Sequence, residues 1–407
     1  MNNKLLQINV SANWGSHGKI AEGIGEIAMS NGWESYIAFG RFANASQSKL
    51  IKIGNKWDQR LHGLATRLFD RHGLASAKAT TELVKSIEKI NPDIIHLHNV
   101  HGYYLNYPVL FKYLSQSGIP VVWTLHDCWA YTGHCPYPIF AGCSRWMSHC
   151  VPPCPLRKSF LKSWIVDNCR KNFDIKKQCF NSVENLYIVT VSKWLETEVK
   201  KSFLRNKNIR CIYNGVDISI FKPTEYGMLL MKHKIKKTEK VVLGVASIWE
   251  ERKGLYDFYR LRQLLPSTIR IILIGLSAKQ IENLPSGIDG VSRTDSQQEL
   301  AAYYSMADVY VNPSQAETFG MTTAEAMACG TPAIVYDVTA SPELIDEKTG
   351  RAVMLGDVKA LGNTIIEICD KPLSPESCRE RVIQFFNKDK RYQDYMKLYE
   401  EILNSKI

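Results

Sequence analysis

One stretch decides the fold of this chain, and it runs NPSQAETFGMTTAEAMACGTP from Asn312 to Pro332. An apolar run over residues 307–311 precedes it and predicts a buried strand, which Pro313 ends. Residues 321–329 predict a helix that stops at Gly330. A strand, a sharp loop and a helix in this order are typical of an α/β fold.

Two carboxylates flank the turn that begins the predicted helix. Glu317 lies in the loop, and Glu325 lies one turn into the helix. Gly320 lets the backbone approach a ligand closely, and the amides after it form a helix N-terminus, which binds anions and phosphate above all. This arrangement suits a ligand with hydroxyls beside a diphosphate, such as a nucleotide sugar. The alternative is that each glutamate is a helix cap or a solvated surface charge.

Strand-like apolar runs alternate with helical stretches along the whole chain. We expect strands at residues 5–10, 35–39, 94–98, 121–125 and 187–191, and a second set at 241–246, 269–274, 308–311, 333–336 and 352–355. Apolar strands alternating with helices imply parallel sheets covered on both faces. Two such sets predict two Rossmann-like, doubly wound α/β domains.

The junction between the two sets lies near Asn214-Gly215, a turn signal that is followed by a new segment at Pro223. The expected first domain spans residues 1–218 and includes a cysteine-rich insert at about 128–154. The expected second domain spans 219–386, and an amphipathic helix spans 387–407.

The string from Glu317 to Glu325 resembles the Glu-x7-Glu signature of retaining glycosyltransferases in the group-1 family, family 4. That resemblance implies the GT-B fold, with two Rossmann-like domains facing a central cleft and a terminal helix that returns to the first domain. The string at residues 214–221 resembles the family's inter-domain segment. In such enzymes the first glutamate meets the donor sugar and the second holds the ribose hydroxyls, roles that the resemblance implies for Glu317 and Glu325.

Further candidate residues follow the ends of predicted strands, where ligands bind in open α/β sheets. Gly15 and Gly18 match the family's glycine-rich loop, which approaches the donor diphosphate. His126 resembles the strand-end histidine that faces the donor sugar, although a lone histidine is also often structural. We expect Asp127 to orient its ring. A second group, His96, His98, Asn99 and His101, is a hypothesis for acceptor contact.

Two cations follow the first strand of the second domain. Arg252 and Lys253 match the family's Arg-Lys-Gly segment, and such cations neutralise the charge on a leaving diphosphate. Ser247 departs from the pattern, because many members carry Arg at this place. The expected donor-binding set is Gly15, Gly18, Arg252, Lys253, Phe319, Gly320, Met321, Thr322 and Glu325, and the expected catalytic set is His126, Glu317 and Lys253.

The net charge of +11 is concentrated in one part of the chain. Residues 1–222 hold 28 Lys and Arg against 15 Asp and Glu. A basic half suits an anionic partner, which could be nucleic acid, anionic lipid or a phosphorylated acceptor, or it is simply a soluble surface. Cations at residues 157–162 alternate with Phe160, Leu161 and Trp164, a mixture that suits a membrane interface.

The cysteines suggest a structural metal and no disulfide framework. There are 11 cysteines in a chain without signal-peptide anatomy, so disulfides are not expected. The insert lacks regular periodicity and needs a staple, and four of its thiols match the ligand number of one tetrahedral Zn²⁺. The four are Cys135, Cys143, Cys150 and Cys154. Buried free thiols are the alternative.

Taken together, the resemblance implies a hexosyltransferase-type enzyme. The cysteine-rich insert after His126 resembles that of a subgroup used in synthesis of bacterial surface polysaccharide (capsule, O-antigen or exopolysaccharide). The enzyme would use a nucleoside-diphosphate sugar without a catalytic cofactor, since no Asp-x-Asp site for Mg²⁺ is present. The expected acceptor is a saccharide linked to undecaprenyl diphosphate. Because no run of about 18 apolar residues is present, we expect a cytoplasmic protein, peripheral on the inner face of the membrane. The alternatives are a sugar-nucleotide epimerase or phosphorylase of the same fold, or a basic nucleic-acid-binding protein.

Overall fold

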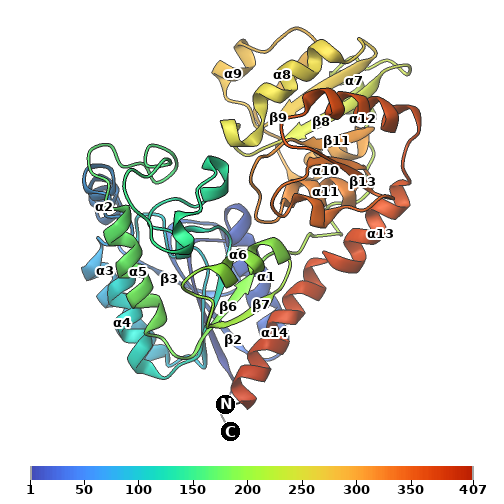
Figure 1. Ribbon diagram of the computed structural model, residues 1–407. Coiled ribbons are helices and arrows are strands. Elements are labelled where there is room, and N and C mark those ends of the chain that lie inside the picture. The colour runs from blue at the N-terminus through green and yellow to red at the C-terminus, as the bar shows by residue number, and fades with distance from the viewer. Residues whose placement is uncertain (1, 406–407) are drawn as a thin grey trace. The chain divides into compact units, whose positions relative to one another are not determined.

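A computed structural model describes residues 2–405 and divides the chain into two compact units. The first unit contains the residues up to Ile212 together with those from Arg391 onward. The second unit runs from Tyr213 to Lys390. Each unit is a parallel sheet flanked by helices (Figure 1).

The first unit contains a seven-stranded parallel sheet in the order β3-β2-β1-β4-β5-β6-β7. Its strands are β1 (Lys4–Ala12), β2 (Glu34–Ala43), β3 (Lys49–Lys52), β4 (Ile94–Leu97), β5 (Val121–Leu125), β6 (Leu186–Thr190) and β7 (Asn208–Cys211). Its helices are α1 (Gly15–Ser30), α2 (Lys56–Phe69), α3 (Ala77–Ile90), α4 (Tyr107–Ser117), α5 (Cys169–Asn181) and α6 (Lys193–Lys201). The strand order reverses between β1 and β4, which is the switch point where Rossmann-like folds bind ligands.

Residues 126–168 connect β5 to α5 with only three short 3₁₀ turns. These turns are η1 (Trp129–Tyr131), η2 (Pro138–Ala141) and η3 (Arg145–Met147). The expected cysteine-rich insert therefore lies in an irregular connection, as its lack of periodicity indicates.

The second unit contains a six-stranded parallel sheet in the order β10-β9-β8-β11-β12-β13. The strands are β8 (Lys240–Val245), β9 (Ile269–Ile274), β10 (Ile288–Val291), β11 (Val309–Asn312), β12 (Ala333–Tyr336) and β13 (Gly350–Val353). The helices are α7 (Gly227–Lys232), α8 (Leu255–Leu264), α9 (Ala278–Glu282), α10 (Gln297–Met306), α11 (Met321–Ala328), α12 (Val358–Asp370) and α13 (Pro375–Phe385), with 3₁₀ turns η4 (Glu251–Lys253) and η5 (Ser341–Leu344).

The last helix, α14 (Lys388–Asn404), packs its apolar face into the core of the first unit. Tyr392, Tyr395 and Tyr399 are buried there with residues of β1 and α1. The Tyr399 hydroxyl also lies 2.6 Å from Nδ1 of His96, at the centre of the first sheet. The two sheets and their helices confirm the prediction of two Rossmann-like domains.

Candidate functional site

The loop between β11 and α11 holds Glu317 at the carboxyl edge of the second sheet. β11 ends at Asn312, and the loop continues to Gly320, whose φ of 101° precedes α11. The Glu317 amide donates to Thr339 Oγ1 at 3.0 Å, and the Ala340 amide donates to the Glu317 carbonyl at 3.2 Å. The loop is therefore tied to the segment after β12, which restricts where the Glu317 carboxylate can lie.

The η4 turn brings two cations to this loop. Lys253 Nζ donates to Glu317 Oε1, and the two side chains form an ion pair. Arg252 Nη1 donates to the Ala316 carbonyl at 2.6 Å. The predicted positions of Arg252, Lys253 and Glu317 thus meet, although they are separated by about 60 residues in the sequence.

Gly254 makes this close approach possible. Its φ is +74°, in the left-handed region that favours glycine. A Cβ at this position would lie 2.4 Å from the Pro313 carbonyl oxygen. The backbone of the η4 turn can therefore pack on the β11–α11 loop only because residue 254 has no side chain.

The Glu317 carboxyl is ionised at neutral pH. Burial raises its pKa, but the charges of Lys253 and Arg252, together with the Lys253 hydrogen bond, outweigh burial and lower the pKa overall. The Glu317 and Lys253 side chains are only 12% and 22% exposed. The pair can therefore present an acceptor for a sugar hydroxyl next to a cation for a phosphate.

Glu325 lies one turn into α11 and is held by a partner that sequence reasoning missed. The Tyr304 hydroxyl, from α10, donates to Glu325 Oε2 at 3.1 Å. Burial raises the pKa of Tyr304 well above its usual range, so the phenol stays a donor. No motif in the sequence marks Tyr304, because its role depends on α10 packing beside α11.

The first turn of α11 is braced from β11. The Tyr310 hydroxyl donates to Thr322 Oγ1 at 2.8 Å, and Asn312 Nδ2 donates to Thr323 Oγ1 at 3.0 Å. Gly320 at the N-cap has no side chain to cap the amides of this turn, and the turn contains no acidic residue. An N-terminus without a side-chain cap carries a partial positive charge that attracts anions.

Phe319 does not present its side chain to a ligand. The ring is 2% exposed and packs against Phe386 and Tyr213, with centroids 5.5 and 6.2 Å away. Its contribution to a donor site is therefore limited to its backbone. Ser247, where many family members carry Arg, is exposed after β8.

In the first unit, His126 lies at the carboxyl end of the fully buried strand β5. The side chain is 8% exposed. Burial is the main cause that lowers its pKa well below the usual value, so the imidazole is neutral at physiological pH. A neutral histidine here can exchange hydrogen bonds with sugar hydroxyls.

A chain of hydrogen bonds assigns the tautomer of His126. Gln7 Nε2 donates to the Ala21 carbonyl at 2.7 Å, which leaves Gln7 Oε1 to accept from His98 Nε2 at 3.0 Å. His98 is neutral because burial lowers its pKa, so its Nδ1 accepts, at 3.2 Å, from His126 Nε2. His126 therefore carries its proton on Nε2, and its Nδ1 is an acceptor. Gln7 is a second residue that no sequence signal revealed.

Asp127 does not orient His126, contrary to the prediction. Its Oδ2 lies 2.8 Å from His101 Nε2, and its Oδ1 accepts from the Trp129 amide at 2.9 Å. His98, not Asp127, orients His126. Asp127 instead pairs with a member of the group proposed for acceptor contact.

His96 is not available to an acceptor. The side chain is fully buried, with Nδ1 2.6 Å from the Tyr399 hydroxyl and Nε2 2.8 Å from Thr124 Oγ1. It holds α14 against the sheet. The acceptor hypothesis fails for His96 and likewise for His98, whose two ring nitrogens bond with Gln7 and His126. It stays a hypothesis for Asn99 and His101.

The glycine-rich loop after β1 lies beside His126. Gly15 is the first residue of α1. Gly18 fits against the loop because it has no Cβ, and a Cβ at this position would lie 2.8 Å from Ser11 Oγ. His17, in the same turn, has its ring centroid 5.4 Å from that of His126. Burial, mainly, lowers the pKa of His17 to about 4, so it too is neutral. His17 is a site residue that the sequence contained but that no motif marked.

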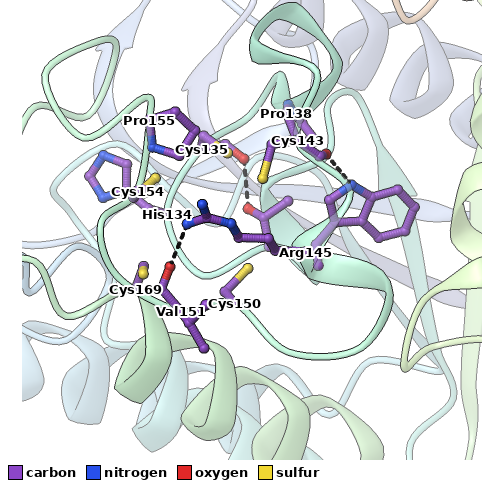
Figure 2. Close-up of a pocket in the computed structure, with 12 residues that line it drawn as sticks. His134, Cys135, Pro138, Cys143, Arg145, Cys150, Val151, Cys154, Pro155 and Cys169 are labelled. Carbon is purple, nitrogen blue, oxygen red and sulfur yellow. Dashed lines mark hydrogen bonds between the residues drawn. The ribbon is translucent and has the colours of Figure 1, made fainter.

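Five thiols line one small pocket in the irregular connection, as Figure 2 shows. They are the predicted Cys135, Cys143, Cys150 and Cys154 with the additional Cys169. The pocket encloses about 10 Å³, room for about one water molecule. All eleven cysteines lie within the described residues and none forms a disulfide. Within residues 2–405, no three His, Cys, Asp or Glu side chains are arranged to hold a metal, so the structural zinc stays a prediction.

Two family models match the chain. Residues 31–220 match the model described as "Glycosyltransferase Family 4", and residues 239–371 match "Glycosyl transferases group 1".

No helix within residues 2–405 is long and apolar enough to cross a bilayer.

Named proteins are similar over much of the chain. A putative colanic acid biosynthesis glycosyl transferase, WcaC, of Escherichia coli is 23% identical, covering 88% of this chain and 89% of that protein. An N-acetyl-alpha-D-glucosaminyl L-malate synthase of Bacillus anthracis is 26% identical over 54% of this chain, a match that spans 61% of that protein. The structure of Anabaena HepE in complex with UDP and glucose has a TM-score of 0.69 at 16% identity, covering 98% of this chain and 100% of that chain.

Proposed function

Because this chain belongs to the glycosyltransferases, with a family 4 domain followed by a group 1 domain, we propose that it transfers a sugar from a nucleoside-diphosphate sugar to a saccharide acceptor with retention of configuration. The observation that carries this proposal is the arrangement around α11. There Lys253 of η4 pairs with Glu317 in the β11–α11 loop, and an uncapped helix N-terminus and Glu325 follow along the same loop and helix.

Each part of that arrangement suits one part of the donor. The cations of Arg252 and Lys253, with the amides at the start of α11, would bind the diphosphate and stabilise its charge as it departs. Glu325 would accept from the ribose hydroxyls, and Glu317 would orient the sugar. These groups supply the positive charge that a leaving diphosphate needs, so we propose that transfer needs no bound Mg²⁺.

The first unit would hold the acceptor. His126, with an acceptor Nδ1, would lie near the anomeric carbon and exchange hydrogen bonds with sugar hydroxyls. We propose that the acceptor saccharide is linked to a lipid diphosphate at the inner face of the cell membrane, and that the product contributes to a surface polysaccharide. The name of the E. coli relative supports this context.

The test is thermal stabilisation by UDP, GDP, ADP, TDP and CMP. The complex of the Anabaena protein with UDP makes UDP the first nucleotide to test. We expect one nucleotide to raise the melting temperature of the native chain but not that of Glu325→Ala. Glu282→Ala is the matched control, because Glu282 is an exposed glutamate at the end of α9.

The control variant should respond to the nucleotide as the native chain does. Equal stabilisation of native and Glu325→Ala protein would overturn the ribose role. If no nucleotide stabilises the native chain, the proposed donor site is wrong.

A further inference from the structure

Helix α2 presents its apolar side chains to solvent. Trp57, Leu61 and Leu64 follow one another at spacings of four and three residues, which places them in one stripe along the helix. They are 68%, 63% and 49% exposed. In a surface helix of a globular protein such a stripe faces the core, so this exposure needs an explanation.

The face of α2 that packs on the protein is polar. His62 Nε2 accepts from the Gly73 amide at 2.9 Å, and His62 Nδ1 lies 2.9 Å from Ser76 Oγ. The Thr66 hydroxyl donates to the His62 carbonyl at 2.9 Å and is fully buried. The two bonds of the His62 ring fix the rotation of the helix about its axis, so the apolar stripe cannot turn inward.

A second exposed segment continues this surface. The Trp164 amide donates to the Arg67 carbonyl at 2.7 Å, and Asn168 Nδ2 donates to the Phe69 carbonyl at 2.8 Å, which fastens the segment to the end of α2. Ile165 is 67% exposed. We call the combined set the α2 surface, and it consists of Trp57, Leu61, Leu64, Phe69, Phe160, Trp164 and Ile165.

Cations are interspersed in the sequence with the residues of the α2 surface. They are Lys56, Arg60, Arg67, Arg71, Arg157, Lys158 and Lys162. The guanidinium of Arg60 lies 5.0 Å from the centre of the Trp57 ring, and that of Arg67 lies 5.8 Å from the Trp164 ring. The acids of α2 and its C-cap are already engaged, since Asp58 caps the helix and Asp70 bonds with His134.

We propose that the α2 surface docks on a bilayer that contains anionic phospholipid. Exposed tryptophans and aliphatic side chains with interspersed Arg and Lys suit the interface between headgroups and acyl chains. A second copy of the chain is a poorer occupant, because a symmetric contact would bring the same cations together. Nucleic acid would match the cations but would leave the aliphatic stripe in water.

The α2 surface also reaches the candidate site of the first unit. The Phe160 ring lies 6.3 Å from the ring of His101, which pairs with Asp127. A docked bilayer would therefore present lipid-linked groups close to these side chains. This last point, the presentation of lipid-linked groups, rests on the proposed function. Docking on the bilayer does not, because vesicle binding is measured without sugar transfer.

The experiment is co-sedimentation of the full chain with vesicles of phosphatidylcholine alone and of phosphatidylcholine mixed with phosphatidylglycerol. We expect binding to the mixed vesicles and little to the neutral ones. Trp57→Ser/Leu61→Ser/Trp164→Ser should reduce partitioning about tenfold or more, because three apolar side chains that would enter the bilayer are lost. Arg60→Gln/Lys162→Gln should reduce it about fivefold for each cation removed.

A matched control replaces Met228 and Met231 of α7 by Ser, because these side chains are 76% and 67% exposed in a basic helix of the second unit. It should bind as the native chain does, and all variants should keep the native melting temperature. Failure of the native chain to bind the mixed vesicles would overturn the proposal. Native-like binding by the triple variant would do the same, as would a native dimer that the triple variant converts to monomer.

Discussion

Lys253→Met tests whether the cation beside Glu317 acts on the leaving diphosphate. The substitution keeps the length of the side chain and removes its charge. A unit charge at about 4 Å from a phosphate contributes about 4 kcal/mol where the effective dielectric constant is about 20. Both side chains of the pair are mostly buried, so this value applies better than that for bulk water. Part of the charge is already engaged by Glu317, and a loss of about 3 kcal/mol remains.

Such a loss corresponds to about a 10²-fold fall in kcat. The assay is the initial rate of nucleoside-diphosphate release, with saturating donor of the base that the thermal screen selects. Lys279→Met is the control, because Lys279 is an exposed lysine of α9. It should turn over at the native rate.

Lys253→Met also leaves the Glu317 carboxylate without its ion-pair partner, which destabilises the fold. Adding Glu317→Gln removes that unpaired charge, so the double variant should regain melting temperature without regaining turnover. If Lys253→Met keeps kcat within about threefold of the native value, a threefold change being under 1 kcal/mol, the lysine has no part in leaving-group departure. If the double variant regains turnover together with stability, the role of Lys253 is structural.

Three further outcomes are expected. Burial lowers the pKa of His62 and His17 to about 4, from an unfolded value of about 6.5. Between these two pH values the unfolded chain therefore binds more protons than the folded chain. The melting temperature should fall as pH drops from about 6.5 toward 4. A melting temperature that stays flat across this range would contradict the buried neutral histidines. Long-range ¹⁵N NMR should find His126 protonated on Nε2, whereas a proton on Nδ1 would refute the chain from Gln7 through His98. We also propose that one structural zinc is held by Cys135, Cys143, Cys150 and Cys154. Elemental analysis of protein purified without added chelator should detect about one zinc ion per chain. Protein that contains neither zinc nor iron would exclude this metal site.

The central strands were predictable from the sequence, whereas three edge strands, β3, β7 and β10, were not. β5 and β9 match their predicted bounds, because a central strand covered on both faces needs a continuous apolar run. The edge strands β3 and β7, KLIK and NIRC, are mostly exposed and carry no such signal. They form because a neighbouring strand supplies hydrogen-bond partners, which is a property of the assembled sheet.

The sequence by itself determined the group around α11. Glu317, Gly320 and Glu325 lie within one strand-loop-helix unit, so local spacing sets their positions. The prediction for Lys253 also depended on its place after a strand, since parallel strands end at one edge of a sheet.

Only the tertiary structure decided how the side chains pair. Tyr304 reaches Glu325 from another helix, and His98 binds His126 while Asp127 turns to His101. Adjacency in sequence suggested the opposite for Asp127, because successive residues after a strand need not point to the same side. The rotation of α2 likewise depends on packing, because His62 bonds with Gly73 and Ser76 of the segment that follows the helix, and these bonds leave the apolar stripe exposed. Hydrogen bonds between distant segments exist only after packing, so no local pattern encodes them.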